Sequence, residues 1–138
     1  AIAAHEVGHA IQHQQGYAFL RFRTALVPLA NIGSSLSYII IMAGIFLTAL
    51  GSAFGSTALW IGAGLMSLAV LFSIVTLPVE FNASSRAMKQ ITALNIVNEK
   101  EYKHAKKVLS AAAMTYVAST AVALAELARI ILLARSSE

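Results

Sequence analysis

The chain has 138 residues, of which 58% are hydrophobic and only 12% are charged, a balance far from that of a soluble globular domain. It contains no cysteine, which excludes disulfides and thiolate metal sites. Its net charge of +4 does not indicate nucleic-acid binding, because most basic residues lie near the ends of apolar stretches and form no patch interleaved with aromatic residues. The composition therefore predicts an all-α integral membrane protein in contact with the lipid bilayer.

The first predicted element is a helix over residues 1–17 that contains the pattern His-Glu-x-x-His as "HEVGH". On a helix, His5 and His9 lie about 40° apart around the axis and about 6 Å along it, so both imidazoles can reach one metal ion. Glu6 lies beside this face, where its carboxylate can reach a metal-bound water as a general base. Zinc suits such a site because it accepts nitrogen and oxygen ligands and keeps one position for water. No Ser, Thr, Asp or Asn caps the helix, so we expect the chain to be a fragment that lacks its N-terminal part.

The next elements are two membrane spans that form a hairpin over residues 31–77. Between Arg23 and Glu80 lie 56 residues without a charge, and one span needs only about 20 apolar residues. We place the spans at residues 31–50 and 57–77, joined by the turn-prone stretch "GSAFGS".

The chain after the hairpin is expected to form a surface helix and then a third span. Pro78 disfavours helical geometry at the preceding residue and suits the first turn of a new helix, so a separate helix is predicted over residues 79–95. The uncharged stretch that follows the lysine-rich segment predicts the third span over residues 108–134. Within it, Glu126 and Arg129 are three residues apart and are expected to pair near the membrane surface.

The distribution of Lys and Arg predicts the orientation of the spans. The hairpin turn carries neither residue type, whereas eight of the ten lie on the opposite side: Arg21, Arg23, Arg86, Lys89, Lys100, Lys103, Lys106 and Lys107. By the positive-inside rule, that side is cytoplasmic.

A catalytic zinc site needs a third protein ligand, and two residues are candidates. His13 lies about 80° round the helix from His5 and about 12 Å along it, too far for three histidines of one straight helix to bind one ion well. A two-span hairpin returns the chain to the side it left, which brings Glu80 back beside the histidines. Glu80 also lies in the first turn of its predicted helix, where the helix dipole favours a carboxylate. Glu80 is therefore the predicted third ligand, and His13 is the alternative.

The stretch "AAHEVGHAIQ", the hydrophobic hairpin and the stretch "LPVEFNASSRA" together resemble the YugP-like neutral zinc metallopeptidase family over the whole chain. The resemblance implies a gluzincin-type site with His5, His9 and Glu80 as zinc ligands and Glu6 as the catalytic base. It also implies a multi-pass protein of the bacterial inner (plasma) membrane, with a further membrane segment and a linker ahead of the histidine helix.

A more distant resemblance, to membrane proteases of the HtpX and CAAX-prenyl type, concerns the residues that follow the third ligand. Those proteases carry Glu-x-x-Ala-Asp, whereas this chain reads "EFNAS" from Glu80 to Ser84. The carboxylate that usually orients a metal-bound histidine is missing, and Asn82 or Ser84 is expected to replace it. Arg86 is a candidate for contact with the substrate carbonyl or oxyanion, and the alternative for it is an ordinary arginine that faces a phosphate or forms a salt bridge. His13, if not a ligand, is expected at the surface or behind the ligands.

The sequence thus predicts a membrane-embedded peptidase with one zinc ion per chain. Glu6 takes a proton from the metal-activated water and delivers it to the leaving amine. A site this close to lipid suits peptides or membrane-protein segments as substrates. The alternative is a non-catalytic membrane protein with a structural or regulatory zinc site, which the missing aspartate favours and the presence of Glu6 disfavours. A transporter is disfavoured because the hairpin has no charged group to line a pathway.

Overall fold

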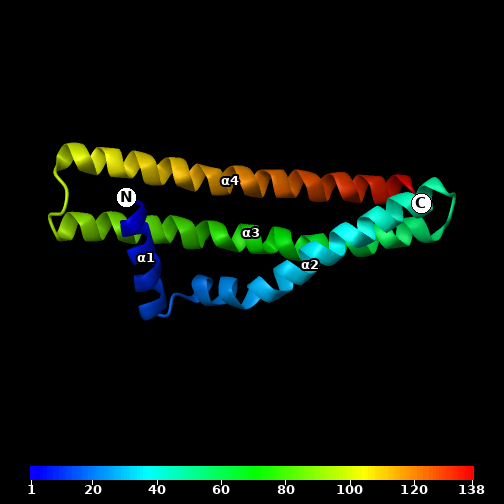
Figure 1. Ribbon diagram of the computed structural model, residues 1–138, viewed down its shortest axis with the longest axis horizontal. Helices are drawn as coiled ribbons and strands as arrows, with labels where there is room; N and C mark the ends of the chain where they lie inside the picture. The colour runs from blue at the N-terminus through cyan, green and yellow to red at the C-terminus, as the bar shows by residue number, and fades with distance from the viewer. The chain divides into compact units, whose positions relative to one another are not determined.

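The computed structural model describes residues 1–138, and all of its regular secondary structure is helical. Four helices follow one another: α1 (Ile2–Gln14), α2 (Ala18–Ala49), α3 (Phe54–Ala93) and α4 (Glu99–Ser136) (Figure 1). By length and composition, α2, α3 and α4 can each cross a membrane. The predicted all-α membrane fold is confirmed.

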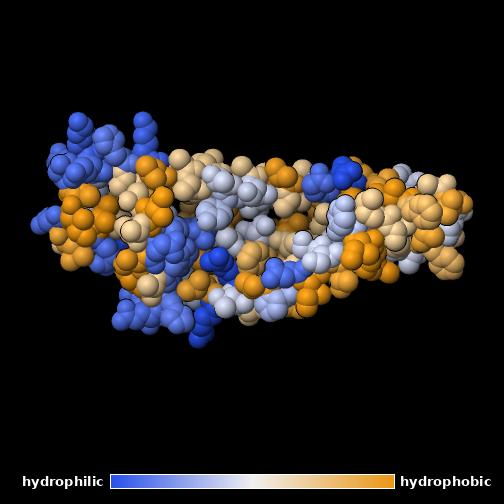
Figure 2. Space-filling view, in the orientation of Figure 1, coloured by the Kyte–Doolittle hydropathy of each residue, from blue (hydrophilic) through white to orange (hydrophobic).

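The chain divides into two compact units. The site unit comprises Ala1–Thr24 and Ile74–Ser119, and the hairpin unit comprises Ala25–Ser73 and Thr120–Glu138. Eight of the ten Lys and Arg residues belong to the site unit. Figure 2 shows hydrophilic side chains gathered around the loop between α3 and α4 and around the C-terminal end of α1. All the candidate site residues named above also lie in the site unit.

The structure differs from the sequence prediction at two prolines. α2 begins at Ala18, contains Pro28 and runs through the start predicted near residue 31. α3 continues through Pro78 to Ala93, so the helix start predicted near Val79 is wrong. A proline inside a helix removes one backbone hydrogen bond and crowds the carbonyl four residues before it, but membrane helices tolerate this where neighbouring helices pack against them.

Packing explains why α3 remains helical at Pro78. Residues spaced by four lie on one face of a helix, and such a row of buried side chains passes straight through this position: Val75, Val79, Ala83, Ala87 and Ile91. If the helix broke at Pro78, the buried side chains that follow it, from Val79 to Ile91, would lose their packing contacts. Glu80 is therefore held in the middle of a long helix and not in a first turn.

The helix ends in the site unit carry recognisable stop and start signals. After α1, the Tyr17 N–H donates to the carbonyl of Gln12 and the Gly16 N–H donates to that of His13, with Gly16 at φ 64°, the pattern of a Schellman motif. Asn98 and Glu101 cap the start of α4 by donating backbone N–H groups to each other's side chains. The α1 end matters for the site, because its tight turn leads directly into the first residues of α2.

The hairpin unit contains the predicted pair of antiparallel segments, joined at residues 50–53. Its buried core is made by side chains of α2, α3 and α4: Ile41, Leu59, Ala63, Ile130 and Ala134. Arg129 donates to Glu126 at 2.8 Å, and both side chains are about half exposed or more, so the predicted pair forms.

Candidate metal centre

One face of α1 carries the candidate ligands and packs against α3 (Figure 1). His5, Gly8, His9 and Gln12 follow the spacing i, i+3, i+4 and i+7, which places them on one side of a helix. Gly8 is buried, and a Cβ added there would collide with the backbone carbonyl oxygen of Ala83 in α3. The glycine inside the "HEVGH" pattern therefore lets α1 approach the part of α3 that carries Glu80.

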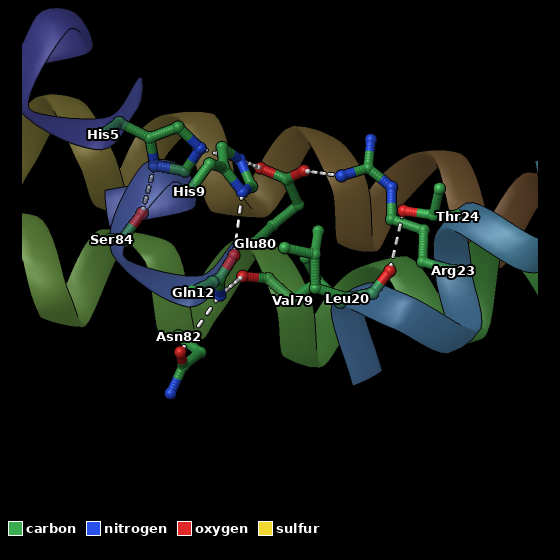
Figure 3. A network of polar contacts seen from close by, with 10 residues as sticks. All are labelled: His5, His9, Gln12, Leu20, Arg23, Thr24, Val79, Glu80, Asn82 and Ser84. Atoms are coloured by element: carbon green, nitrogen blue, oxygen red, sulfur yellow. Dashed lines mark hydrogen bonds and ion pairs between the residues drawn. The ribbon is translucent and has the colours of Figure 1, made fainter. Parts of the chain in front are cut away.

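At this contact, one carboxylate and two imidazoles converge. The Nε2 atom of His5 lies 2.8 Å from Oε2 of Glu80, and the Nε2 atom of His9 lies 3.4 Å from the same oxygen. One ligand atom from each of these three residues lies within 4.8 Å of the other two. The Glu80 side chain is only 4% exposed. Figure 3 shows the three side chains pointing toward one another from α1 and α3.

Gln12 determines which nitrogen of His9 carries the proton. The amide nitrogen of Gln12 donates to the carbonyl of Val79 at 2.8 Å and to Oδ1 of Asn82 at 3.0 Å. A carbonyl can only accept, so the amide of Gln12 has its nitrogen on that side and its oxygen toward His9. That oxygen lies 2.9 Å from Nδ1 of His9, which must therefore donate. The lone pair on Nε2 of His9 is left facing Glu80.

Ser84 contacts the other histidine in the corresponding way. Its hydroxyl lies 3.0 Å from Nδ1 of His5, where it can accept the Nδ1 proton. Ser84 occupies the position at which the resembled proteases carry an aspartate, and of the two residues expected to replace that carboxylate, it is the one that touches a histidine. Asn82 instead accepts from Gln12 and from Arg86.

The donor set fits a zinc ion. If Nδ1 of His5 donates to Ser84 as Nδ1 of His9 does to Gln12, the three converging atoms are all acceptors, a set that a metal cation satisfies. Tetrahedral zinc with bonds of about 2.0–2.1 Å holds its ligand atoms about 3.3 Å apart, close to the 2.8 and 3.4 Å that separate Oε2 of Glu80 from the two Nε2 atoms. Two neutral imidazoles and one carboxylate form a set found in catalytic zinc sites.

The second oxygen of Glu80 faces a cation supplied by α2. Nη1 of Arg23 lies 3.6 Å from Oε1 of Glu80, and the Arg23 side chain is 30% exposed (Figure 3). The carboxylate thus directs one oxygen to the histidines and the other to Arg23. A buried carboxylate is costly unless it is paired, and Arg23 supplies that partner.

The remaining predicted residues lie in different surroundings. Glu6 is exposed and lines a small cavity together with His5 and Glu80. His13 is exposed and lies outside the ligand cluster.

Arg86 donates to Asn82 at 2.6 Å and to the side chain of Gln15, and its guanidinium lies over the ring of Tyr17, 5.6 Å from the ring centre. Arg86 therefore joins the end of α1 to α3 through two amide side chains.

Three residues beside the ligands were not predicted from the sequence: Gln12, Arg23 and, on α4, Tyr116, which interacts with Glu80. Gln12 could have been found from its spacing, since it lies three residues beyond His9 on the same helix face. Arg23 gives no local signal, because its approach to Glu80 depends on the turn between α1 and α2.

Known proteins match this chain over almost its full length. Residues 1–135 match the family described as "Putative neutral zinc metallopeptidase". The chain is 41% identical over 133 residues to the "Putative membrane protease YugP" of Bacillus subtilis (strain 168), a match that covers 96% of this chain and 56% of the relative. The chain thus spans little more than half the length of that relative. No solved structure matches it.

The family match and the three long apolar helices agree with the convergence of two histidines and a glutamate on one point. The resemblance inferred from the sequence is confirmed, and the chain belongs to the neutral zinc metallopeptidase family of membrane proteins.

Proposed function

We propose that this chain forms the catalytic part of a membrane-embedded zinc peptidase of the gluzincin type. His5, His9 and Glu80 hold one zinc ion, and Glu6 is the general base. The observation that carries the proposal is the convergence of His5 and His9 with Glu80, which lies 75 residues beyond His5. Nδ1 of each histidine is within hydrogen-bond distance of Ser84 or Gln12.

Zinc held by these residues would supply a Lewis acid for the substrate carbonyl and lower the pKa of a water molecule. Glu6 is exposed in the cavity beside His5, where its carboxylate takes a proton from water and later gives it to the leaving amine nitrogen. Gln12 holds His9 in the tautomer that leaves Nε2 free for a metal, Ser84 can accept the Nδ1 proton of His5, and Arg23 balances the charge of Glu80. In this proposal Glu6 carries out both proton transfers, from water and to the leaving amine.

The substrate is a peptide or a segment of a membrane protein, cleaved at the cytoplasmic face. The support for the cytoplasmic side is the concentration of basic residues in the unit that holds the site, because Lys and Arg accumulate on the cytoplasmic side of membrane proteins.

Metal content tests the ligand set. Protein purified in detergent and dialysed against a weak chelator is measured by mass spectrometry as wild type, Glu80→Ala and His13→Ala. We expect about one zinc per chain in the wild type and in His13→Ala, and its loss in Glu80→Ala, since a catalytic zinc site needs three protein ligands. Zinc retained in Glu80→Ala would show that the proposed ligand set is wrong.

Glu6→Gln separates the peptidase from a protein with structural zinc. A peptidase should keep its zinc and lose peptide hydrolysis, because the amide cannot accept the proton. If the wild type binds zinc but hydrolyses no more peptide than Glu6→Gln, the structural alternative holds.

A further inference from the structure

A cavity of about 170 Å³ lies directly beside the candidate metal centre, within the site unit. One wall carries the polar groups of the site, including His5 and Glu6. Another wall belongs to α4 and is formed by Tyr116 and four apolar residues: Val108, Leu109, Ala112 and Ala113. The proposed mechanism involves the polar residues of this cavity, and the apolar residues of α4 have no role in it.

The size of the cavity limits what can enter it. A cavity of about 150 Å³ in a protein core accommodates one benzene molecule. This cavity can therefore take one side chain of the size of Leu, Met or Phe, whereas an indole ring is larger than the benzene molecule of that comparison. Because Glu6 shares the cavity, a side chain inside it belongs to a residue adjacent to the bond under attack.

The chemistry of the walls selects among side chains of that size. The four apolar residues of α4 offer no side-chain partner to a polar group, and the hydroxyl of Tyr116, which also lines the cavity, is already engaged with Glu80. Burying a polar group without a partner is costly. The carboxylates of Glu6 and Glu80 border the cavity and disfavour a second negative charge. An apolar side chain meets neither obstacle.

We propose that this cavity is the specificity subsite of the peptidase and receives an apolar side chain, up to the size of Phe, from a residue flanking the scissile bond. The residues of α4 that line the cavity, above all Ala112, set the upper size limit. This inference rests on the proposed peptidase function and adds the substrate class.

Two neighbouring alanines on α4 allow a matched test. Ala111 and Ala112 are both exposed, but only Ala112 lines the cavity. Ala112→Leu adds three carbon atoms to the cavity, whereas Ala111→Leu adds the same atoms outside it. Since neither alanine is buried, both variants should fold, and zinc content verifies this for each.

The zinc-loaded full chain in detergent is incubated with a peptide library derived from a digested proteome, and cleavage sites are mapped by mass spectrometry. The kcat/KM values are then measured for peptides that differ only at the selected position, with Ala, Leu, Phe, Trp or Asp. We expect the wild type to prefer Leu and Phe over Asp and Trp. In Ala112→Leu, kcat/KM for Leu and Phe should fall about 10- to 200-fold relative to Ala, and Ala111→Leu should behave like the wild type.

A separate variant and a binding measurement complete the test. Val108→Ala enlarges the cavity and should raise kcat/KM for Trp relative to Phe. The same peptides, labelled with a fluorophore, are also bound to the zinc-loaded Glu6→Gln protein, and their affinities are measured by fluorescence anisotropy. These affinities should rank the side chains in the same order as kcat/KM does for the wild type.

The outcomes separate the two proposals. Wild-type protein that cleaves nothing beyond the Glu6→Gln background overturns the peptidase function, and the subsite with it. Cleavage without a side-chain preference, or a preference that Ala112→Leu and Ala111→Leu change equally, overturns the subsite alone.

Discussion

At the scale of single residues, Gln12 is the strongest test of how the histidines are held. It is fully buried and bonds Val79, Asn82 and His9 at once. Gln12→Ala leaves Nδ1 of His9 without its acceptor, and groups that orient metal-bound histidines typically change metal affinity about 10- to 100-fold. We expect zinc affinity to fall by that factor, as measured by competition with a chelating dye.

Gln14 provides the control for this change. It lies two residues further along α1 and is exposed, so Gln14→Ala should bind zinc as the wild type does. Equal zinc affinity in Gln12→Ala and Gln14→Ala would contradict the role given to the buried amide.

Some residues of the metal centre can be predicted from the sequence and others cannot. His5, Glu6 and His9 follow from one local pattern, and Glu80 follows from counting membrane crossings. The spacing of Gln12 places it on the ligand face without revealing its partners, and Arg23 gives no local signal, because an Arg near a membrane surface is common for other reasons. Their contacts depend on how α1, α2 and α3 pack, which local spacing does not specify.

At the scale of helices, the contact between α1 and α3 at Gly8 positions the centre. Gly8→Ala places a methyl group against the carbonyl of Ala83, and backbone atoms cannot move aside as a flexible side chain does. We expect α1 to be displaced, with destabilisation of about 1–3 kcal/mol and loss of bound zinc. Thermal unfolding in detergent and metal content would measure both effects.

The matched control is Gly64, which also lies inside a helix but has no atom close to its missing Cβ. Gly64→Ala should keep its zinc and gain up to about 1 kcal/mol, because alanine favours a helix over glycine. A Gly8→Ala protein as stable and as zinc-rich as Gly64→Ala would show that the close approach is not needed.

The helix boundaries show where prediction by sequence pattern fails. Pro78 predicts a helix start by its local preferences, yet the row of buried residues from Val75 to Ile91 keeps α3 intact. The same row was present in the sequence as small and β-branched residues at a spacing of four. Long-range packing therefore outweighs a local signal where a buried stripe passes through it.

At the scale of the whole molecule, zinc should contribute to stability, because a ligand that binds only the folded state stabilises it by mass action. At a free zinc concentration about 100 times the Kd, this amounts to about 2.7 kcal/mol. Removal of zinc with a chelator should lower the Tm of the wild type in detergent and leave that of Glu80→Ala unchanged. An unchanged wild-type Tm would argue against zinc binding by the folded protein.

The orientation of the protein in the membrane can be tested because the chain has no cysteine, so a single introduced thiol is the only one labelled. Ala53→Cys lies in the exposed turn between α2 and α3, and His104→Cys lies at an exposed position near the start of α4. The positive-inside rule places the basic start of α4 in the cytoplasm and the uncharged turn on the other side.

In intact cells with a permeable outer layer, a membrane-impermeant maleimide should therefore label Ala53→Cys directly, whereas His104→Cys should react only after the membrane that holds the protein is opened. His5, Glu6 and Glu80 belong to the same compact unit as His104, so labelling at His104 also reports the side of the membrane on which the site faces solvent. Direct labelling of His104→Cys would place the site outside the cytoplasm, and its substrates would then be peptides on the external face of the membrane.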